Sequence, residues 1–320
     1  MRDTFRRHWQ RFRPHFRRRH SYSSRFAGRN RDYDAQHIGP REQVSYVCNA
    51  TDFFDCAEEQ VVALLQRRPE VHDLDRDIDR LRKKFEQSGL AHDGMVALLA
   101  QAPRAVLAQI QMDQHPHGYR DKHERLYELI DFNDTFVSVV LLLSDHERLR
   151  FAEATKQACD RICKRVGAPC YTNEQWTAIV RGLTREIAVY WAAKNRGLNV
   201  LLTSRIQDAM GIDLQVQDPE TKRYINIDVK TPSSFRHRLE QLVKEGRLSE
   251  RELLQADERS YCIETNGHKG DRVEVLLLCI LPDLFGELAY FRFVNEEPMQ
   301  ERLLLLIRDH GLTDGRFGKV

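Results

Sequence analysis

Alternating apolar and polar residues predict a β-hairpin in the second half of the chain. Leu214 and Val216 alternate with polar residues before a turn at residues 218–223, and the same alternation resumes after it. Side chains alternate along a strand, and residues paired across a hairpin point to the same side. A loop centred on the turn therefore pairs Leu214 with Ile227. Val216 then faces Ile225, so both apolar pairs share one face suited to burial.

The opposite face of this hairpin carries the polar residues. In the same register Asp213 faces Asp228, and Gln215 faces Asn226. Two carboxylates directly opposite each other, roughly 5 Å apart at Cβ, repel unless something neutralises them. A divalent cation such as Mg²⁺ does so simply, because it prefers carboxylate oxygens, water and phosphate as ligands. Lys230 lies two residues past Asp228 and shares this face; a solvated strand face is the plain alternative for these residues.

A second element is predicted to reach the same face. Apolar residues recur at helical spacing over residues 174–195, and Gly197 fits the end of that helix. At about 100° per residue, Glu186 falls at the border of the apolar stripe. A helix packed on the sheet would thus bring Glu186 to the rim of the carboxylate site, although an ordinary helix-edge charge is the alternative. Residues 199–203 read as the next strand.

Together these residues resemble the PD-(D/E)XK nuclease superfamily over residues 174–294. The matching residues are Glu186, Asp213, Asp228, Val229 and Lys230. The resemblance implies a restriction-endonuclease-like core and hydrolysis of phosphodiester bonds with Mg²⁺, for which Mn²⁺ can substitute. It also implies that the two aspartates bind the metal, with the valine carbonyl and the glutamate as further ligands. The lysine would orient or activate the attacking water. One departure is Ile212, which stands where the family motif has proline.

The rest of the chain is predicted to be mostly helical before this region and mixed within it. Helices are expected at residues 55–67, 74–88, 93–101, 103–112, 123–130, 145–166, 235–245 and 249–257. Strand-like runs at residues 272–281 and 287–293 would extend the sheet. The fold class is therefore α/β, with a central mixed β-sheet flanked by helices. Three parts are expected: an arm and linker at 1–42, a helical domain or extension at 43–170, and a nuclease-like domain at 171–320.

Charge is distributed unevenly along the 320 residues. The net charge is +2. Residues 1–31 hold eleven arginines and one acid, Asp3, so this segment has a charge of about +10 and the rest of the chain about −8. Arginines interleaved with aromatic residues suit sequence-independent binding of nucleic acid. An organelle-targeting segment and a disordered solubilising tail are the alternatives for this arm. The sequence has no run of about 18 apolar residues, so a soluble protein without a membrane span is expected.

Cysteine and histidine spacing supports no other metal chemistry strongly. Seven cysteines are odd in number and irregularly placed, which favours a reducing compartment, the cytoplasm, with nucleoid association left open. The group Cys159, Cys163 and Cys170 lacks the spacing of an iron–sulfur site. Three histidines, His115, His117 and His123, read as a polar loop more readily than as a zinc site.

These observations favour a Mg²⁺-dependent nuclease acting on nucleic acid, with DNA as the favoured substrate. The alternative is a non-catalytic nucleic-acid-binding protein that uses a nuclease-like scaffold and the arginine-rich arm. A third reading is a toxin-like or mobile-element nuclease whose helical half engages a partner. The sequence leaves a homodimer open.

Overall fold

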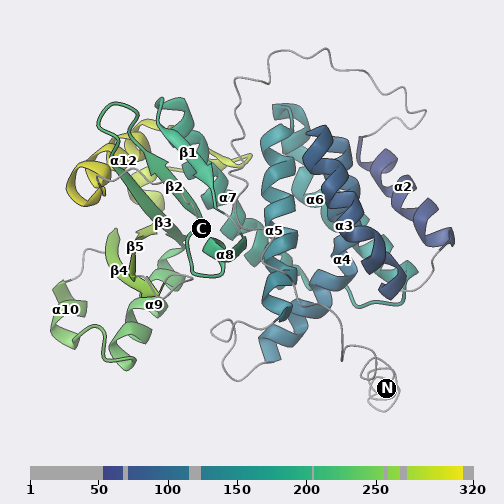
Figure 1. Ribbon diagram of the computed structural model, residues 1–320, viewed down its shortest axis with the longest axis horizontal. Helices are drawn as coiled ribbons and strands as arrows, with labels where there is room; N and C mark the ends of the chain where they lie inside the picture. The colour runs from purple at the N-terminus through teal and green to yellow at the C-terminus, as the bar shows by residue number, and fades with distance from the viewer. Residues whose placement is uncertain are drawn as a thin grey trace. The chain divides into compact units, whose positions relative to one another are not determined.

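A mixed five-stranded β-sheet and a group of long helices make up the described part of the chain (Figure 1). The computed structural model describes residues 53–67, 71–114, 124–203, 205–255, 259–266 and 272–312, which belong to one compact unit. The predicted α/β class is confirmed. The arm and linker predicted at residues 1–42 lie outside the described residues.

The described part of residues 43–170 is formed by long helices. They are α2 (Phe53–Arg67), α3 (Val71–Ser88), α4 (Ala91–Gln114), α5 (Glu124–Leu142) and α6 (Asp145–Arg165). Their shared core contains large side chains that are less than 2% exposed, among them Met95, Leu98, Phe132, Phe136 and Phe151. The prediction of an almost wholly helical region is therefore confirmed for these residues.

Two helices predicted at residues 93–101 and 103–112 are in fact one helix, α4, with Pro103 inside it. Proline lacks an N–H and cannot bond to the carbonyl four residues earlier, which is why a helix start was expected there. Pro103 is buried, and so are Leu99 and Val106 on either side of it. Packing of α4 against α3 and α5 thus outweighs the loss of one backbone hydrogen bond.

Helix α7 (Asn173–Asn195) confirms the helix predicted at 174–195 and joins two hydrophobic cores. Trp176 and Ile187 belong to the core of the helical region, whereas Ala188 and Ala193 belong to the core beneath the sheet. Gly197 follows with φ 86°, a left-handed conformation that favours glycine and ends the helix. The helix that carries Glu186 is therefore held on both sides.

The sheet has strand order β1-β2-β3-β5-β4. The strands are β1 (Asn199–Leu202), β2 (Leu214–Gln217), β3 (Tyr224–Lys230), β4 (Ser260–Asn266) and β5 (Arg272–Cys279). The β3 and β5 strands are parallel and the other neighbours antiparallel. One face packs against α7 and α12 (Glu297–His310), and the other packs against α9 (Pro232–Lys244).

Short helices and strands lie in the connections between the main elements, and two of these strands contradict one prediction. They are α8 (Arg205–Asp208), α10 (Glu250–Gln255), α11 (Pro282–Phe285), β6 (Leu288–Ala289) and β7 (Arg292–Phe293). The run at 287–293 was expected to extend the main sheet, and that prediction is wrong: β6 and β7 pair only with each other there. Tyr290 and Phe291 between them have φ of 52° and 66°, so the chain turns back on itself instead of continuing as one strand.

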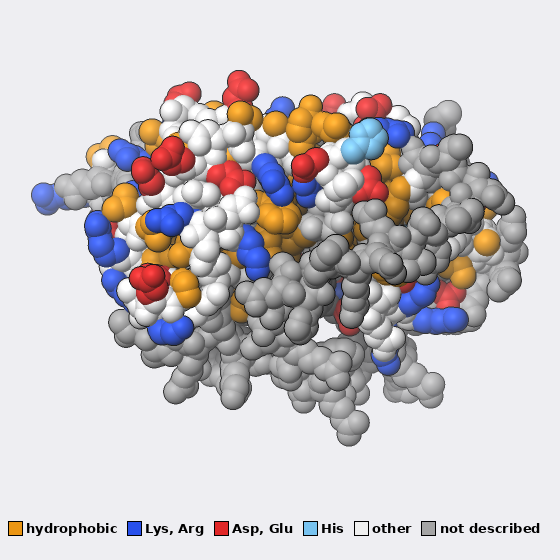
Figure 2. Space-filling view, turned by 90° about the horizontal axis from the view of Figure 1, so that it is seen from above, with side chains coloured by type: hydrophobic (Ala, Val, Ile, Leu, Met, Phe, Trp, Pro, Cys, Tyr) orange, Lys and Arg blue, Asp and Glu red, His pale blue; other side chains and the backbone are white. Residues whose placement is uncertain are grey.

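The described surface carries charges of both signs. In Figure 2, Lys and Arg side chains are interspersed with Asp and Glu side chains over the face shown. No helix in the described ranges is both long enough and apolar enough to cross a membrane.

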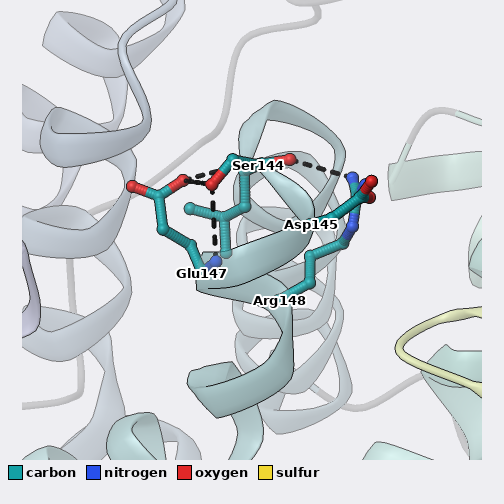
Figure 3. Close-up of polar contacts among 5 residues, drawn as sticks. Ser144, Asp145, Glu147 and Arg148 are labelled. Carbon is teal, nitrogen blue, oxygen red and sulfur yellow. Dashed lines mark hydrogen bonds and ion pairs between the residues drawn. The ribbon is translucent and has the colours of Figure 1, made fainter.

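The start of α6 connects the helical region to α7. Ser144 and Glu147 form a capping box there, and the Arg148 guanidinium donates to the Leu143 carbonyl at 2.9 Å and pairs with Asp145 (Figure 3). The Arg148 guanidinium also lies 5.7 Å from the ring centroid of Trp191 on α7, and that of Arg292 on β7 lies 4.4 Å from it. This stack fixes α7 against both neighbours.

Candidate active site

The predicted hairpin register is confirmed. Leu214 pairs with Ile227 and Val216 with Ile225, and all four side chains are at most 3% exposed. Gln215 pairs with Asn226, and the Gln215 side-chain amide donates to the Asn226 side-chain oxygen at 2.7 Å. The apolar underside therefore sets the register, and this register places Asp213 next to Asp228 on the other face.

Asp213 and Asp228 share a hydrogen bond at the open end of the hairpin. The Asp213 amide donates to the Ile227 carbonyl at 2.8 Å, and the Val229 amide donates to Asp213 Oδ2 at 2.7 Å. Burial, the charge of Asp228 and the hydrogen bond between the two carboxyls raise the pKa of Asp213 to about 7. Asp213 therefore ionises near neutral pH, where a cation that binds its carboxylate would compete with the proton.

Lys230 forms an ion pair with Asp228. Burial acts against the charged form of Lys230, but the charges of Asp228 and Asp213 outweigh it and raise its pKa. Lys230 is therefore a cation at neutral pH and a hydrogen-bond donor. Gly211 lies beside Asp228, where a Cβ would make an ordinary contact of 3.5 Å with Asp228 Oδ2, and its φ of 79° is a left-handed conformation that favours glycine.

Glu186 on α7 faces the same group of charges, as the sequence predicted. Burial first, and then the charges of Asp213, Asp208 and Asp134, raise its pKa well above the ordinary value, while Lys230 acts in the opposite direction. The structure thus brings Glu186, Asp213, Asp228 and Lys230 together. Val229 packs its partly buried side chain against the core on the other face of the sheet and donates its amide N–H to Asp213.

Two further acids at this site were not predicted. Asp208 ends the single turn of α8, and burial together with the charges of Asp134 and Asp213 raises its pKa well above the ordinary value. Asp134 lies on α5, which contacts α8. Asp208 was open to prediction as a third acid five residues before Asp213. Asp134 could not be predicted as part of the site, because it lies on α5, far along the sequence, and nothing in the residues around it indicates contact with α8.

The donor set fits a hard divalent cation. Five carboxyl groups act on one another here, and the lysine is the cation that lowers the pKa of three of them. Buried carboxyls without enough compensating charge are costly, and oxygen donors of this kind are what Mg²⁺ prefers. Asp213 and Asp228 are the pair that could hold such an ion; in the described residues no third Asp, Glu, His or Cys has a ligand atom within 4.8 Å of both, so Glu186 and Asp208 act on the pair through their charge.

The other candidate groups do not join this site. Cys159 and Cys163 are fully buried in the helical core, and burial raises the pKa of Cys163 to about 12, as expected of packing thiols. Cys170 donates a hydrogen bond from Sγ to the Asp160 carbonyl at 3.7 Å. The three histidines considered for zinc, at positions 115, 117 and 123, lie outside the described residues.

Comparison of the chain with protein-family models, with curated proteins and with solved structures gave no match. The chemistry of the site therefore has to be inferred from its own residues.

Proposed function

We propose that this protein is a Mg²⁺-dependent nuclease that hydrolyses phosphodiester bonds, with DNA as the favoured substrate. The observation that carries the proposal is the hydrogen-bonded pair of Asp213 and Asp228 on adjacent strands, with Lys230 ion-paired beside it. Opposed carboxylates with a lysine resemble the PD-(D/E)XK site and its restriction-endonuclease-like core. The mixed sheet with helices on both faces is compatible with that core.

Each residue has a distinct part in the proposed reaction. Asp213 and Asp228 would hold the cation, and Mn²⁺ could replace Mg²⁺ there. The chemistry that such a cation supplies is neutralisation of phosphate charge and easier deprotonation of water. Lys230, with its raised pKa, stays protonated and donates hydrogen bonds to a phosphate oxygen or to the attacking water. It thus orients water and stabilises charge, and it does not act as a base.

The surroundings of Lys230 also suit a phosphate. Helix α9 begins directly after it, with Thr231 as N-cap and Pro232 in the first turn. The N-terminal end of a helix carries partial positive charge. Arg236 and His237 are exposed on the same helix, whereas Arg238 lies 3.6 Å from Glu245. We assign contact with the nucleic-acid backbone to the exposed pair.

The test is a cleavage panel with the full-length protein. Single-stranded, double-stranded and branched DNA and RNA would be incubated with Mg²⁺ or Mn²⁺, and Asp228→Asn, which keeps the shape of the side chain, should lower the rate by about three orders of magnitude or more, equivalent to about 4 kcal/mol. Glu220→Gln, an exposed carboxylate in the turn of the same hairpin, is the matched control and should cut normally.

Two outcomes would contradict the proposal. Cleavage that survives Asp228→Asn at the parent rate would assign the activity to another site or to a contaminant. Absence of cleavage with every substrate and metal, together with tight salt-dependent binding, would favour the non-catalytic nucleic-acid-binding protein.

A further inference from the structure

Three side chains of types that can bind metals converge on the sheet face opposite the carboxylate site. Cys262 lies on β4, Glu274 on β5 and His310 at the end of α12. One ligand atom from each, the cysteine Sγ, a carboxylate oxygen and an imidazole nitrogen, lies within 4.8 Å of the other two. Among the described residues, no other group of three His, Cys, Asp or Glu side chains has its ligand atoms within 4.8 Å of one another.

The strand register accounts for the first two ligands. Cys262 pairs directly with Leu276, and Glu274 is two residues before Leu276 on the same strand. The two are therefore diagonal neighbours on one face of the sheet. Leu276 also pairs with Ile227, whose side chain points away from the face that carries Asp228. The group is thus separated from the candidate active site by the sheet itself.

Backbone pairing brings the third ligand to the same place. Just past α12, Leu312 forms a bridge with Tyr224 at the start of β3, with N–H···O distances of 3.0 Å and 2.7 Å. The Arg223 guanidinium donates to the Gly311 carbonyl at 2.9 Å and 3.1 Å. These bonds hold the chain end of α12 against the sheet, so His310 is positioned although its side chain is exposed.

The space among the three side chains suits a small ion. A hollow with room for roughly one water molecule is bounded by Cys262, Glu274 and His310, together with Asn226 and the apolar residues Ile225, Leu276 and Leu312. Cys262 Sγ donates to Glu274 Oε1 at 2.7 Å, a close approach for sulfur. A tetrahedral Zn²⁺ holds its sulfur ligand at about 2.3 Å and its oxygen ligand at about 2.0–2.2 Å, so these two atoms would move slightly apart to share one ion.

We propose that Cys262, Glu274 and His310 form a binding site for Zn²⁺ or another borderline-soft divalent cation. Sulfur, imidazole and carboxylate donors together are typical of Zn²⁺ and differ from the all-oxygen set that Mg²⁺ prefers. Three protein ligands leave a fourth position for water. Because the ligands come from β4, β5 and α12, the bound ion would fasten the end of α12 to the sheet and stabilise the fold.

Cobalt provides the test, because its complexes with thiolate absorb light. Full-length protein stripped of metal with a chelator would be titrated with Co²⁺ in the absence of nucleic acid. We expect thiolate-to-cobalt charge-transfer absorption that corresponds to one thiolate-bound Co²⁺ per chain and is displaced by Zn²⁺; Co²⁺ bound by the carboxylates of Asp213 and Asp228 adds no such absorption. Cys262→Ser should abolish the absorption, and His310→Ala should weaken Co²⁺ binding at least about tenfold.

Matched variants keep the test specific. Cys170→Ser and His146→Ala alter a partly buried cysteine and an exposed histidine elsewhere, and Asp228→Asn alters the carboxylate site; all three should retain the absorption. His310 is exposed, so its substitution leaves the core intact, and circular dichroism would verify folding. Absence of the absorption in the parent protein, or its persistence in Cys262→Ser, would overturn the proposal.

Discussion

Asp213 and Asp228 illustrate how folding can bring like charges together at a local cost. The register that pairs Leu214 with Ile227 leaves the two carboxyls no other place. The pKa of Asp213 rises to about 7 because burial and Asp228 oppose its ionisation, and Glu186 is raised in the same direction. A carboxyl group whose pKa is raised by folding destabilises the folded state once it ionises. Ionisation of these carboxyls therefore lowers the free energy of unfolding of the metal-free protein.

The pH dependence of stability follows from that shift. Asp213 has a pKa of about 3.9 when unfolded and about 7 when folded, so between these values the folded state binds more protons. In chelator, the free energy of unfolding should therefore fall as pH rises from about 4 to about 7. Urea denaturation measures it. Mg²⁺ at pH 7 should restore stability, and Asp213→Asn should flatten the slope; an unchanged slope in that variant would contradict the assignment.

Lys230 should affect catalysis much more than binding. Lys230→Met keeps the length of the side chain but removes the cation that is ion-paired with Asp228. We expect the single-turnover cleavage rate to fall by about 100-fold or more, since charge stabilisation at the phosphate is lost, and the dissociation constant for DNA to change by less than about tenfold. Lys244→Met, an exposed lysine at the end of α9, is the control. Equal losses in rate and affinity would mean that Lys230 only binds.

At the scale of elements, the spacing of apolar residues predicted the structure of single helices and of the hairpin. The alternation of Leu214 and Val216 predicted the register, and the apolar stripe of α7 predicted that Glu186 lies near Asp213, whose charge does act on it. It could not place Asp134, because that residue reaches the site through the packing of α5 on α8. Helix α12 was not predicted, although its buried residues Met299, Leu303, Leu306 and Ile307 stand at helical spacing.

Close packing of the long helices depends on one glycine. A Cβ at Gly94 in α4 would lie 2.7 Å from Phe85 of α3 and 2.7 Å from Val139 of α5. Gly94→Ala should therefore lower the free energy of unfolding by about 1–3 kcal/mol through overpacking. Gly182 in α7 faces open space, so Gly182→Ala should raise the free energy of unfolding by about 0.5–1 kcal/mol. Urea denaturation of both variants is the measurement, and a stabilising Gly94→Ala would contradict the packing described.

For the whole molecule, Asp134 shows that the helical region takes part in the carboxylate site. Its charge acts on Glu186 and Asp208, which belong to α7 and α8. The described surface mixes both signs of charge (Figure 2), and the sequence outside residues 1–31 carries about −8. Under the proposed function, a body of this charge repels nucleic acid at long range, so we expect the arginine-rich arm to supply most of the long-range attraction.

Replacement of the eleven arginines in residues 1–31 by glutamine, in the full-length chain, tests this division of roles. Affinity for non-specific DNA should fall, and the plot of log affinity against log salt should flatten, because each phosphate contact contributes a slope of about −0.9. The single-turnover cleavage rate at saturating DNA should stay near that of the parent, since the substitutions leave the residues of the carboxylate site unchanged. Arg165→Gln with Arg251→Gln, two exposed arginines of the body, is the control. An unchanged salt slope in the arm variant would place the phosphate-binding charges on the body.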